Sequence, residues 1–244
     1  MDQQRIKKAA EWLNTSKSIA VITGAGVSTE SGIPDFRSSR GLYNKQTNLT
    51  TPLEEVLSHH FFEQAPDQFY KFYRENLLRR EAQPNPGHVF LADLEKMGKE
   101  VTVITQNIDS LHQKAGSSKV IELHGSTARV VSRDGTIYSY EEAVESETAM
   151  HVGREWVRPD VTLYGEMLDP EDIRRSVEAV SQADVLLVLG TSLNVYPAAG
   201  FVYDFQGDNS ILVNKGRTGL SYPFGLSFKT SISQWAEAVK NELT

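Results

Sequence analysis

The chain has 244 residues, of which 39% are hydrophobic and 23% charged, and its formal net charge is −7. A chain of this length can bury a full hydrophobic core, and its acidic balance disfavours non-specific binding to nucleic acid. It contains no cysteine, which excludes disulfides, thiolate nucleophiles and cysteine metal ligands. Residues 1–5 lack the apolar core of a secretion signal, and no apolar run approaches the ~20 residues of a membrane span. We therefore expect a cytoplasmic protein with neither nucleic-acid nor membrane partners.

Apolar spacing predicts helices and strands that alternate along the chain. An amphipathic helix is expected over residues 3–14. Short apolar runs predict strands at 19–23, 101–105, 119–123, 184–189 and 210–214. Helical patterns separate these strands at about 66–80, 87–97, 170–182 and 233–243. The alternation favours an α/β fold with a Rossmann-like parallel sheet covered on both faces, whose ligands bind beyond the carboxyl ends of the strands.

Two segments interrupt this alternation. Residues 34–65 are expected to form a long loop with short helical pieces, which suits a lid over a ligand. Residues 126–157 are rich in charge and favour a hairpin around Asp134-Gly135. The chain is therefore expected to contain a large domain, a cofactor-binding loop with a helical module, and a smaller inserted module. Their boundaries are 1–33 with 84–125 and 166–244, then 34–83, and then 126–165, respectively.

The first predicted strand ends in Gly24-Ala25-Gly26, where the backbone can turn tightly and approach a ligand closely. The residues after Gly26 can open a helix whose free N–H groups face an anion, as in a dinucleotide pyrophosphate site. Thr29 stands where the third glycine of a dehydrogenase G-x-G-x-x-G pattern would be. The following Pro34-Asp35-Phe36-Arg37 suits a segment that closes over a cofactor better than a core helix.

Polar side chains follow the other predicted strands at their carboxyl ends. Residues 106–109 follow the second strand, His124 the third, 190–192 the fourth and Asn214 the end of the fifth. Because these ends lie along one edge of a parallel sheet, we expect the side chains to surround one ligand. Taken alone, the second segment is more typical of a turn held by Asx hydrogen bonds. The fourth suits ordinary strand-to-helix capping equally well.

The stretch from Val21 to Tyr43, VITGAGVSTESGIPDFRSSRGLY, resembles the sirtuins, a family of NAD-dependent protein-lysine deacylases. Four further segments agree with that family in type and order. They are TQNIDSLH at 105–112, ELHGS at 122–126, RPDV through YGE at 158–166, and GTSLNVYPAA at 190–199. One G-A-G triplet is weakly specific, whereas five motifs in order are strongly specific. The resemblance covers roughly residues 19–214.

The resemblance implies NAD as the cofactor and a defined set of residues around it. In the family's reaction nicotinamide leaves NAD, the acyl-lysine oxygen attacks the ribose, and a base then takes a proton from a ribose hydroxyl. His124 is the implied base, and an imidazole with a pKa near neutrality suits that transfer. Asn107 is the second implied catalytic residue. The implied NAD-binding residues are Gly24, Ala25, Gly26, Ser28, Asp35, Phe36, Arg37, Tyr43, Gln106, Asn107, Ile108, Asp109, His124, Gly190, Thr191, Ser192 and Asn214.

The resemblance also implies where an acyl-lysine protein or peptide binds. An extended peptide is expected to pair with the backbone of two stretches, adding a strand between them. The implied substrate-binding residues are Val161, Tyr164, Gly165, Glu166, Asn194 and Val195. Family members that favour succinyl or malonyl groups carry a tyrosine and, three residues on, an arginine. Here Tyr73 occupies the place of that arginine and Arg74 follows it, which favours acetyl or longer apolar acyl groups.

The missing cysteines are the main departure from the family. Most sirtuins hold a structural zinc with two cysteine pairs, and the matching regions here, 129–135 and 148–153, offer no tetrahedral set of soft ligands. We therefore expect no metal. The inserted module is expected to be stabilised instead by apolar packing around Val130, Ile137, Tyr138, Val152 and Trp156.

The sequence as a whole predicts a zinc-free, NAD-dependent protein-lysine deacylase that transfers the acyl group to ADP-ribose and releases nicotinamide. Two alternatives stay open at this stage. One is an ADP-ribosyltransferase or NAD hydrolase on the same scaffold, although the presence of both His124 and Asn107 argues against it. The other is a non-catalytic NAD-binding regulatory module, in which the altered insertion binds a partner.

Overall fold

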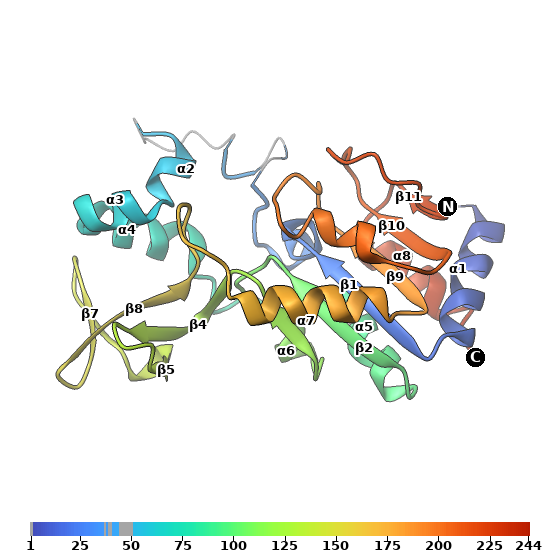
Figure 1. Cartoon of the computed structure of the whole chain (residues 1–244), viewed down its shortest axis with the longest axis horizontal. Coiled ribbons are helices and arrows are strands. Elements are labelled where there is room, and N and C mark those ends of the chain that lie inside the picture. Colours follow the sequence, from blue (N-terminus) through green and yellow to red (C-terminus); the bar gives the residue numbers. More distant parts are fainter. Residues whose placement is uncertain (1, 37, 39–40, 44–50) are drawn as a thin grey trace.

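A six-stranded parallel sheet forms the larger of two lobes in the computed structural model, which describes residues 2–36, 38, 41–43 and 51–244 (Figure 1). The order of its strands across the sheet is β11-β10-β9-β1-β2-β3. Their bounds are Ser18–Thr23 for β1, Glu100–Thr105 for β2, Val120–Glu122 for β3, Val185–Leu189 for β9, Asn209–Val213 for β10 and Leu226–Phe228 for β11. This confirms the predicted Rossmann-like parallel sheet.

The five predicted strands all lie within one residue of their expected bounds. The sixth strand, β11, was not predicted. It has only three residues, Leu226–Phe228, of which the middle one is an exposed serine, so its apolar signal is too short to read. It pairs with β10 and forms one edge of the sheet, beyond the five predicted strands.

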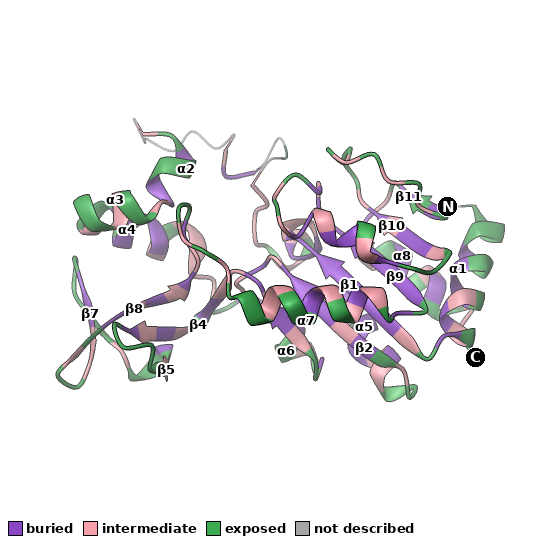
Figure 2. Ribbon diagram, in the orientation of Figure 1, coloured by how far each residue is buried: buried purple, intermediate pink, exposed green. Residues whose placement is uncertain are grey.

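Helices cover both faces of the large sheet, so its central strands are almost entirely buried (Figures 1 and 2). One face packs against α1 (Gln3–Thr15), α5 (Pro86–Lys96) and α8 (Ile232–Lys240). The other packs against α7 (Pro170–Ser181) and the 3-10 helix η5 (Gly200–Asp204). Burial on both faces explains the near-continuous apolar sequences of β1 and β9.

The smaller lobe is a five-stranded antiparallel sheet in the order β5-β4-β8-β7-β6. Two short helices, α3 (His59–Gln64) and α4 (Pro66–Phe72), share an apolar core with it, and a π-helical turn, Tyr73–Leu77, continues α4. The predicted hairpin at Asp134-Gly135 joins β4 and β5. The remaining bounds are Gly125–Ser132 for β4, Ile137–Ser139 for β5, Val144–Glu145 for β6, Met150–Val152 for β7, Glu155–Val161 for β8, Leu53–Val56 for α2 and Leu111–Ala115 for α6.

The predicted packing of the smaller lobe is wrong at two positions. Ile137 and Trp156 are 57% and 65% exposed, because side chains alternate along a strand and their neighbours face the core instead. Trp156 packs its ring on His151, with 3.9 Å between ring centroids. Val130 is buried as predicted, and Tyr138 and Val152 are partly buried against the same core.

Aromatic side chains from the helical module, which were not among the predicted core residues, fill the core of the smaller lobe. Phe69, Tyr70 and Tyr73 pack against Val130 and Met150, and the rings of Phe69 and Tyr73 stack 6.2 Å apart. The core of the smaller lobe is therefore shared between two predicted modules, 34–83 and 126–165, which pack as one unit. Within the described part of the chain, no helix is long and apolar enough to cross a membrane.

Candidate active site

The centre of the site is the point where the chain reverses its direction across the large sheet. From β1, the chain continues through β2 and β3 on one side, whereas β9, β10 and β11 lie on the other. Ligands of such sheets bind in the crevice at this switch point. Gly24-Ala25-Gly26 directly follows β1, and Gly190 directly follows β9, so both loops meet in the crevice.

The two glycine loops approach more closely than side chains would allow. Gly26 N donates to Gly190 O at 2.8 Å, and Gly24 N donates to Leu189 O at 3.2 Å. A Cβ atom added at Gly26 would lie 2.6 Å from Gly190 O. Gly190 has a φ of +61°, and a Cβ there would collide with Val27 N. The glycines therefore let bare backbone from two adjacent strands line one crevice.

Ser28 connects two other predicted site residues, Asn107 and Asp109, through its buried hydroxyl. Asn107 Nδ2 donates to Ser28 Oγ at 3.0 Å, and Ser28 Oγ donates to Asp109 Oδ2 at 2.6 Å. Leu111 N donates to the other oxygen, Asp109 Oδ1, at 2.9 Å. Burial raises the pKa of Asp109, while these two hydrogen bonds act in the opposite direction. Segment 107–109 is thus fixed against the first glycine loop.

His124 lies at the same edge of the sheet, two residues beyond the end of β3. Its Nδ1 is 2.9 Å from the carbonyl oxygen of Gln106. Because a carbonyl only accepts hydrogen bonds, Nδ1 carries the proton, and Nε2 of the neutral ring is an unprotonated acceptor. Burial lowers the pKa of His124 below its ordinary value, and the bond to Gln106 partly offsets this. The ring is therefore held in a form that can take up a proton.

Gln106 and Thr191 join the two strand ends on either side of β1. Gln106 Nε2 donates to Thr191 Oγ1 at 3.1 Å, which joins the end of β2 to the end of β9 across β1. Ser192 O accepts from Gly219 N, and Asn214 Nδ2 donates to Gly216 O at 3.4 Å. The ends of β9 and β10 are thereby linked to the segment that follows β10.

The described part of the predicted cofactor loop folds back on itself. Leu42 N donates to Asp35 O at 2.8 Å and Tyr43 N donates to Phe36 O at 3.0 Å. The rings of Phe36 and Tyr43 lie 6.2 Å apart. Burial, together with Tyr164 and Glu54, raises the pKa of Tyr43, so this loop contacts the predicted substrate-binding segment. Arg37 lies outside the described residues.

The substrate-binding prediction concerns two segments with different surroundings. Tyr164 N donates to Leu57 O and Tyr164 O accepts from His59 N, each at 2.9 Å, so its backbone is already paired within the chain. Gly165 has no backbone hydrogen bond to any residue that the structure describes. Glu166 binds Arg158 at 2.6 Å and His59 at 2.8 Å, and these partners lower its pKa although burial opposes them. The backbone of Gly165 is thus the open part of this segment.

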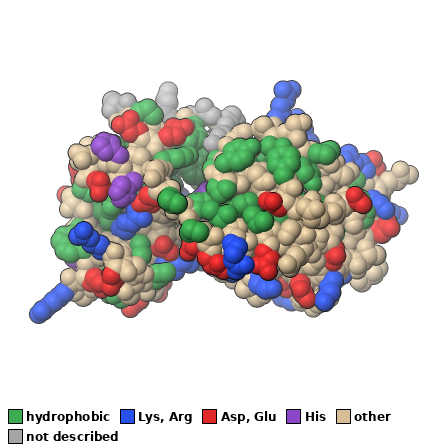
Figure 3. All heavy atoms as spheres, in the orientation of Figure 1, with side chains coloured by type: hydrophobic (Ala, Val, Ile, Leu, Met, Phe, Trp, Pro, Cys, Tyr) green, Lys and Arg blue, Asp and Glu red, His purple; other side chains and the backbone are tan. Residues whose placement is uncertain are grey.

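An apolar surface adjoins the second predicted substrate segment, Asn194-Val195. Tyr196, the next residue, is 68% exposed, and Tyr203 on η5 is 56% exposed. Figure 3 shows hydrophobic side chains gathered over η5 and the segment that follows β10. The Asn194 side chain lies against Gly219, where an added Cβ would collide with it.

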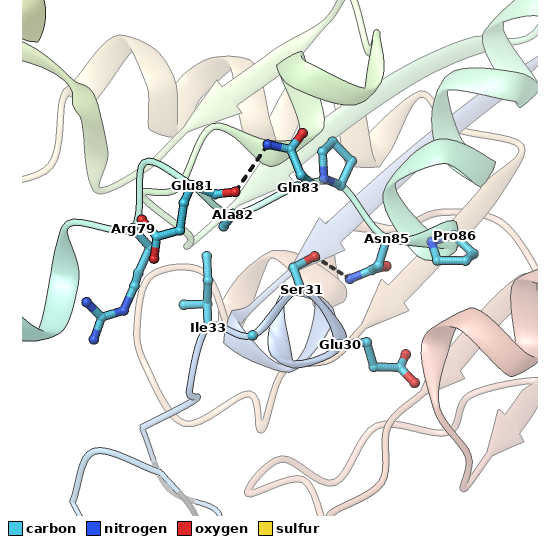
Figure 4. A pocket seen from close by; sticks show the side chains of 11 residues that line it. Glu30, Ser31, Ile33, Arg79, Glu81, Ala82, Gln83, Asn85 and Pro86 are labelled. Carbon is cyan, nitrogen blue, oxygen red and sulfur yellow. Dashed lines mark hydrogen bonds between the residues drawn. The ribbon is translucent and has the colours of Figure 1, made fainter.

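A pocket of about 640 Å³ lies behind the first glycine loop and contains none of the predicted site residues (Figure 4). Its walls are formed by segments 30–33 and 81–86 and by Arg79. Asn85 Nδ2 donates to Ser31 Oγ at 2.9 Å in its wall and to Val27 O at 2.8 Å. The pocket is therefore next to the site but separate from it.

Two buried histidines that are not among the predicted site residues, His88 and His112, support the site from behind. Asn85 N donates to His88 Nδ1 at 3.3 Å, so His88 Nε2 carries the proton and faces Ser28 Oγ at 3.4 Å. His112 Nε2 is 3.1 Å from Thr23 Oγ1, and the two imidazole rings lie 4.8 Å apart. A histidine three residues after a capping asparagine was the available signal for His88.

Comparison with known proteins identifies the family to which the chain belongs. The model of the Sir2 family matches residues 24–197. The chain belongs to the Sir2 family; it is a sirtuin. It is 45% identical to an NAD-dependent protein deacetylase of Clostridium perfringens, over 94% of this chain and 96% of that one. A solved Sir2 structure with p53 peptide and NAD+ has a TM-score of 0.83 and 36% identity, covering 97% of this chain and 98% of that one.

A second solved structure, Sir2 bound to acetylated peptide, is similar with a TM-score of 0.83 and 34% identity, over 97% of this chain and 98% of that one. The residues of the crevice fit NAD, because glycine backbone from two strands meets at the switch point, as a dinucleotide pyrophosphate requires. Among the described residues, no group of three or more histidine, aspartate or glutamate side chains could hold a metal ion.

Proposed function

We propose that this sirtuin uses His124 as the general base and Asn107 as the second catalytic residue. The chain is an NAD-dependent protein deacetylase. The observation that carries the proposal is the bond from His124 Nδ1 to Gln106 O, because it leaves Nε2 as the acceptor at the edge of the crevice. NAD, when bound, supplies the leaving nicotinamide and the ribose that takes the acyl group. His124 Nε2 removes a proton from a ribose hydroxyl.

The network around Ser28 forms the proposed nicotinamide pocket. Asp109 is held by Ser28 and Leu111, so its carboxylate can accept from the carboxamide in a fixed direction. The Ile108 carbonyl accepts from both the backbone N–H and the hydroxyl of Thr127, which fixes the neighbouring backbone. Asn107 is held by Ser28 and positions the ribose. The remaining predicted NAD-binding residues keep their proposed roles, with Arg37 outside the described part.

We propose that an acyl-lysine peptide lies between segments 164–166 and 194–195, with the lysine stem against Val161. Gly165 supports this placement because its backbone is open for strand addition. Glu166 acts indirectly, by holding the segment through Arg158 and His59. With the NAD-binding domain proposed at 1–33, 84–125 and 166–244, the peptide would lie between this domain and the inserted module, 126–165.

We further propose that the enzyme works in the cytoplasm without zinc, nucleic acid or a membrane. The cysteine-free composition supports the absence of zinc, and the net charge of −7 supports the absence of a nucleic-acid partner.

One incubation tests the proposal against the alternatives. The protein is mixed with NAD and an acetyl-lysine peptide, and all products are identified by mass spectrometry. Deacetylated peptide with acetylated ADP-ribose is the expected result. An ADP-ribosylated peptide would indicate a transferase, free ADP-ribose without peptide change an NAD hydrolase, and no product a regulatory module.

His124→Ala should lower deacetylation by roughly 10²–10⁴-fold, the usual size of a general-base contribution. NAD binding, measured by calorimetry, should stay within a few fold, because the mutation leaves the glycine crevice intact. His60→Ala, on the exposed surface of α3, is the matched control. Turnover near that of the wild type in the His124 variant would disprove the assignment.

A further inference from the structure

The strand that follows His124 contains an irregularity that redirects one arginine. At its start β4 pairs regularly with β8, Gly125 opposite Val161 and Ser126 opposite Asp160. The next pair is Val130 with Pro159, so residues 127–129 have no opposite partners on β8. Such bulges bend a strand and change the direction of a side chain. The affected side chain is Arg129.

Arg129 binds two carboxylates from different strands. Its Nη1 donates to Glu122 Oε2 at 2.6 Å, and its Nε donates to Asp160 Oδ2 at 2.8 Å. The side chain of Glu122 is only 8% exposed. The two carboxylates raise the pKa of Arg129, although burial alone would lower it. A buried carboxylate depends on such a partner, because an unpaired charge in this position is costly.

Both carboxylates stand within two residues of a proposed functional residue. Glu122 ends β3, two positions before the proposed base His124, and Asp160 precedes Val161, which would line the tunnel for the lysine stem proposed above. The backbones also meet here. Thr162 N donates to His124 O at 3.0 Å, and Gly125, at φ +74°, packs against Asp160 O so closely that a Cβ would collide.

The same cluster reaches the nicotinamide segment through Ser110. Ser110 Oγ donates to Glu122 Oε1 at 3.2 Å and lies 2.6 Å from Ser126 Oγ. Ser110 follows Asp109 and has a φ of +55°, an uncommon backbone conformation for a residue other than glycine. Three segments that surround the proposed reaction centre are therefore joined by one partly buried polar cluster, in which the Arg129 side chain is 34% exposed.

We propose that Arg129 is a positioning residue, which fixes the distance between His124 and the acyl-lysine tunnel by binding Glu122 and Asp160 at once. This rests on the proposed role of His124. Glu122 lies on β3 of the larger lobe and Asp160 on β8 of the smaller lobe. A side chain that binds both carboxylates therefore fixes the position of one strand relative to the other. A planar guanidinium with a fixed fork of donors can bind two carboxylates in set directions, which a lysine ammonium cannot.

Three variants separate positioning from general stability. Arg129→Gln removes both ion pairs, and Arg129→Lys keeps the charge without the fork. Arg129→Gln with Glu122→Gln also removes the more deeply buried charge and leaves only Asp160, which is 25% exposed, without its partner, so it should fold even where the single change does not. Arg174→Gln is the matched control, because Arg174 also binds two carboxylates, Glu171 and Glu178, but on the exposed surface of α7.

The first measurement uses the protein without ligands. Hydrogen exchange of the Thr162 amide, which donates to His124 O, should become about 10-fold faster in Arg129→Gln. Amides of β1 and β9 should be unchanged, as should all amides tested in the Arg174 control. Unchanged protection of the Thr162 amide in a folded Arg129 variant would contradict the proposal that Arg129 fixes the position of His124 relative to β8.

The second measurement compares two reactions of the same enzyme. Exchange of labelled nicotinamide into NAD requires the acyl-peptide but not the base, whereas deacetylation requires both. Misplacing His124 should lower deacetylation about tenfold or more and leave exchange closer to the wild type, raising the exchange-to-deacetylation ratio. Arg129→Lys should raise it too, since charge alone does not restore the fork. An equal loss of both reactions would show a merely structural role, whereas failure of the His124→Ala test above would instead overturn the base assignment.

Discussion

At the level of single residues, the hydrogen bonds of His124 decide which of its nitrogens can act as a base. The Gln106 carbonyl holds Nδ1 as the donor, so the tautomer is set by the backbone of the neighbouring strand end. The lowered pKa acts in the same direction, because it keeps the ring neutral to a lower pH. A base that must start unprotonated benefits from both effects.

Two neighbouring residues on the helical module bear on the predicted acyl preference. Tyr73 is completely buried and takes part in the core of the smaller lobe, so it presents no cation. Arg74 is 3.6 Å from Glu145 and donates to Ser146 O at 3.2 Å, so its guanidinium is already engaged by the inserted module. An acidic acyl group would therefore be buried without a partner.

We predict that acetyl-lysine peptides are cleaved with a higher kcat/KM than succinyl-lysine peptides of the same sequence. A missing charged hydrogen bond is worth about 1.5–3 kcal/mol, which corresponds to roughly 10- to 150-fold. Competition between the two peptides in one reaction measures the ratio directly. Arg74→Gln should leave the ratio unchanged, and a preference for succinyl-lysine that this variant abolishes would show that Arg74 reaches the acyl group.

At the level of secondary structure, the close contact of two loops makes Gly26 indispensable. A Cβ at Gly26 would lie 2.6 Å from Gly190 O, within backbone that no rotamer change can move. We predict that Gly26→Ala lowers NAD affinity at least about 10-fold or prevents folding, since overpacking of this kind costs about 1–3 kcal/mol. Titration calorimetry and thermal unfolding distinguish the two effects.

Gly200→Ala is the matched control for that substitution. A Cβ at Gly200 meets only the Tyr196 ring, at an ordinary distance of 3.5 Å. Its NAD affinity and melting temperature should therefore equal those of the wild type. If Gly26→Ala behaved like this control, the contact between the two glycine loops would not be needed for NAD binding.

Comparison of the elements also shows what the sequence could and could not specify. The strands of the large sheet are buried on both faces, so their continuous apolar runs mark them clearly, and their ends bring the predicted NAD residues together. The smaller lobe has one face against α3 and α4, and its short strands carry a mixed pattern. Trp156 and Ile137 are expected in the core of this lobe as apolar residues, but strand alternation turns both outward. Contacts such as Arg129 with Asp160 depend on a bulge that no local pattern indicates.

At the level of the whole molecule, the smaller lobe is held by side-chain packing and ion pairs. Aromatic residues of α4 fill its core, and Arg80 and Arg74 connect the helical module to Glu141 and Glu145. We predict that a chelator changes neither the melting temperature nor deacetylation, because the chain has no cysteine to hold a structural zinc. Elemental analysis finding stoichiometric zinc would contradict this.

The stability of the whole chain should depend on pH through two buried histidines. Burial lowers the pKa of His88 to about 4, and burial with the neighbouring His88 lowers that of His112 to about 3. Asn85, Ser28 and Thr23 are their hydrogen-bond partners, and none of these compensates a positive charge. Asp109 contacts His88 through Ser28, and its raised pKa acts in the opposite sense, because protonation relieves a buried carboxylate.

We predict that the melting temperature falls as the pH is lowered from about 6.5 towards 4. In this window the unfolded chain binds protons on His88 and His112, and also on His124, whose pKa is lowered by burial too, and the folded chain excludes them. Acid therefore favours unfolding, and the effect ends once the folded-state pKa values are passed. His112→Gln should have a shallower dependence than the wild type, because one of these buried histidines is gone. His60→Gln, on the exposed surface of α3, should keep the full dependence. Calorimetric scans at four or five pH values measure all three proteins, and equal slopes for His112→Gln and the wild type would show that other groups control acid unfolding.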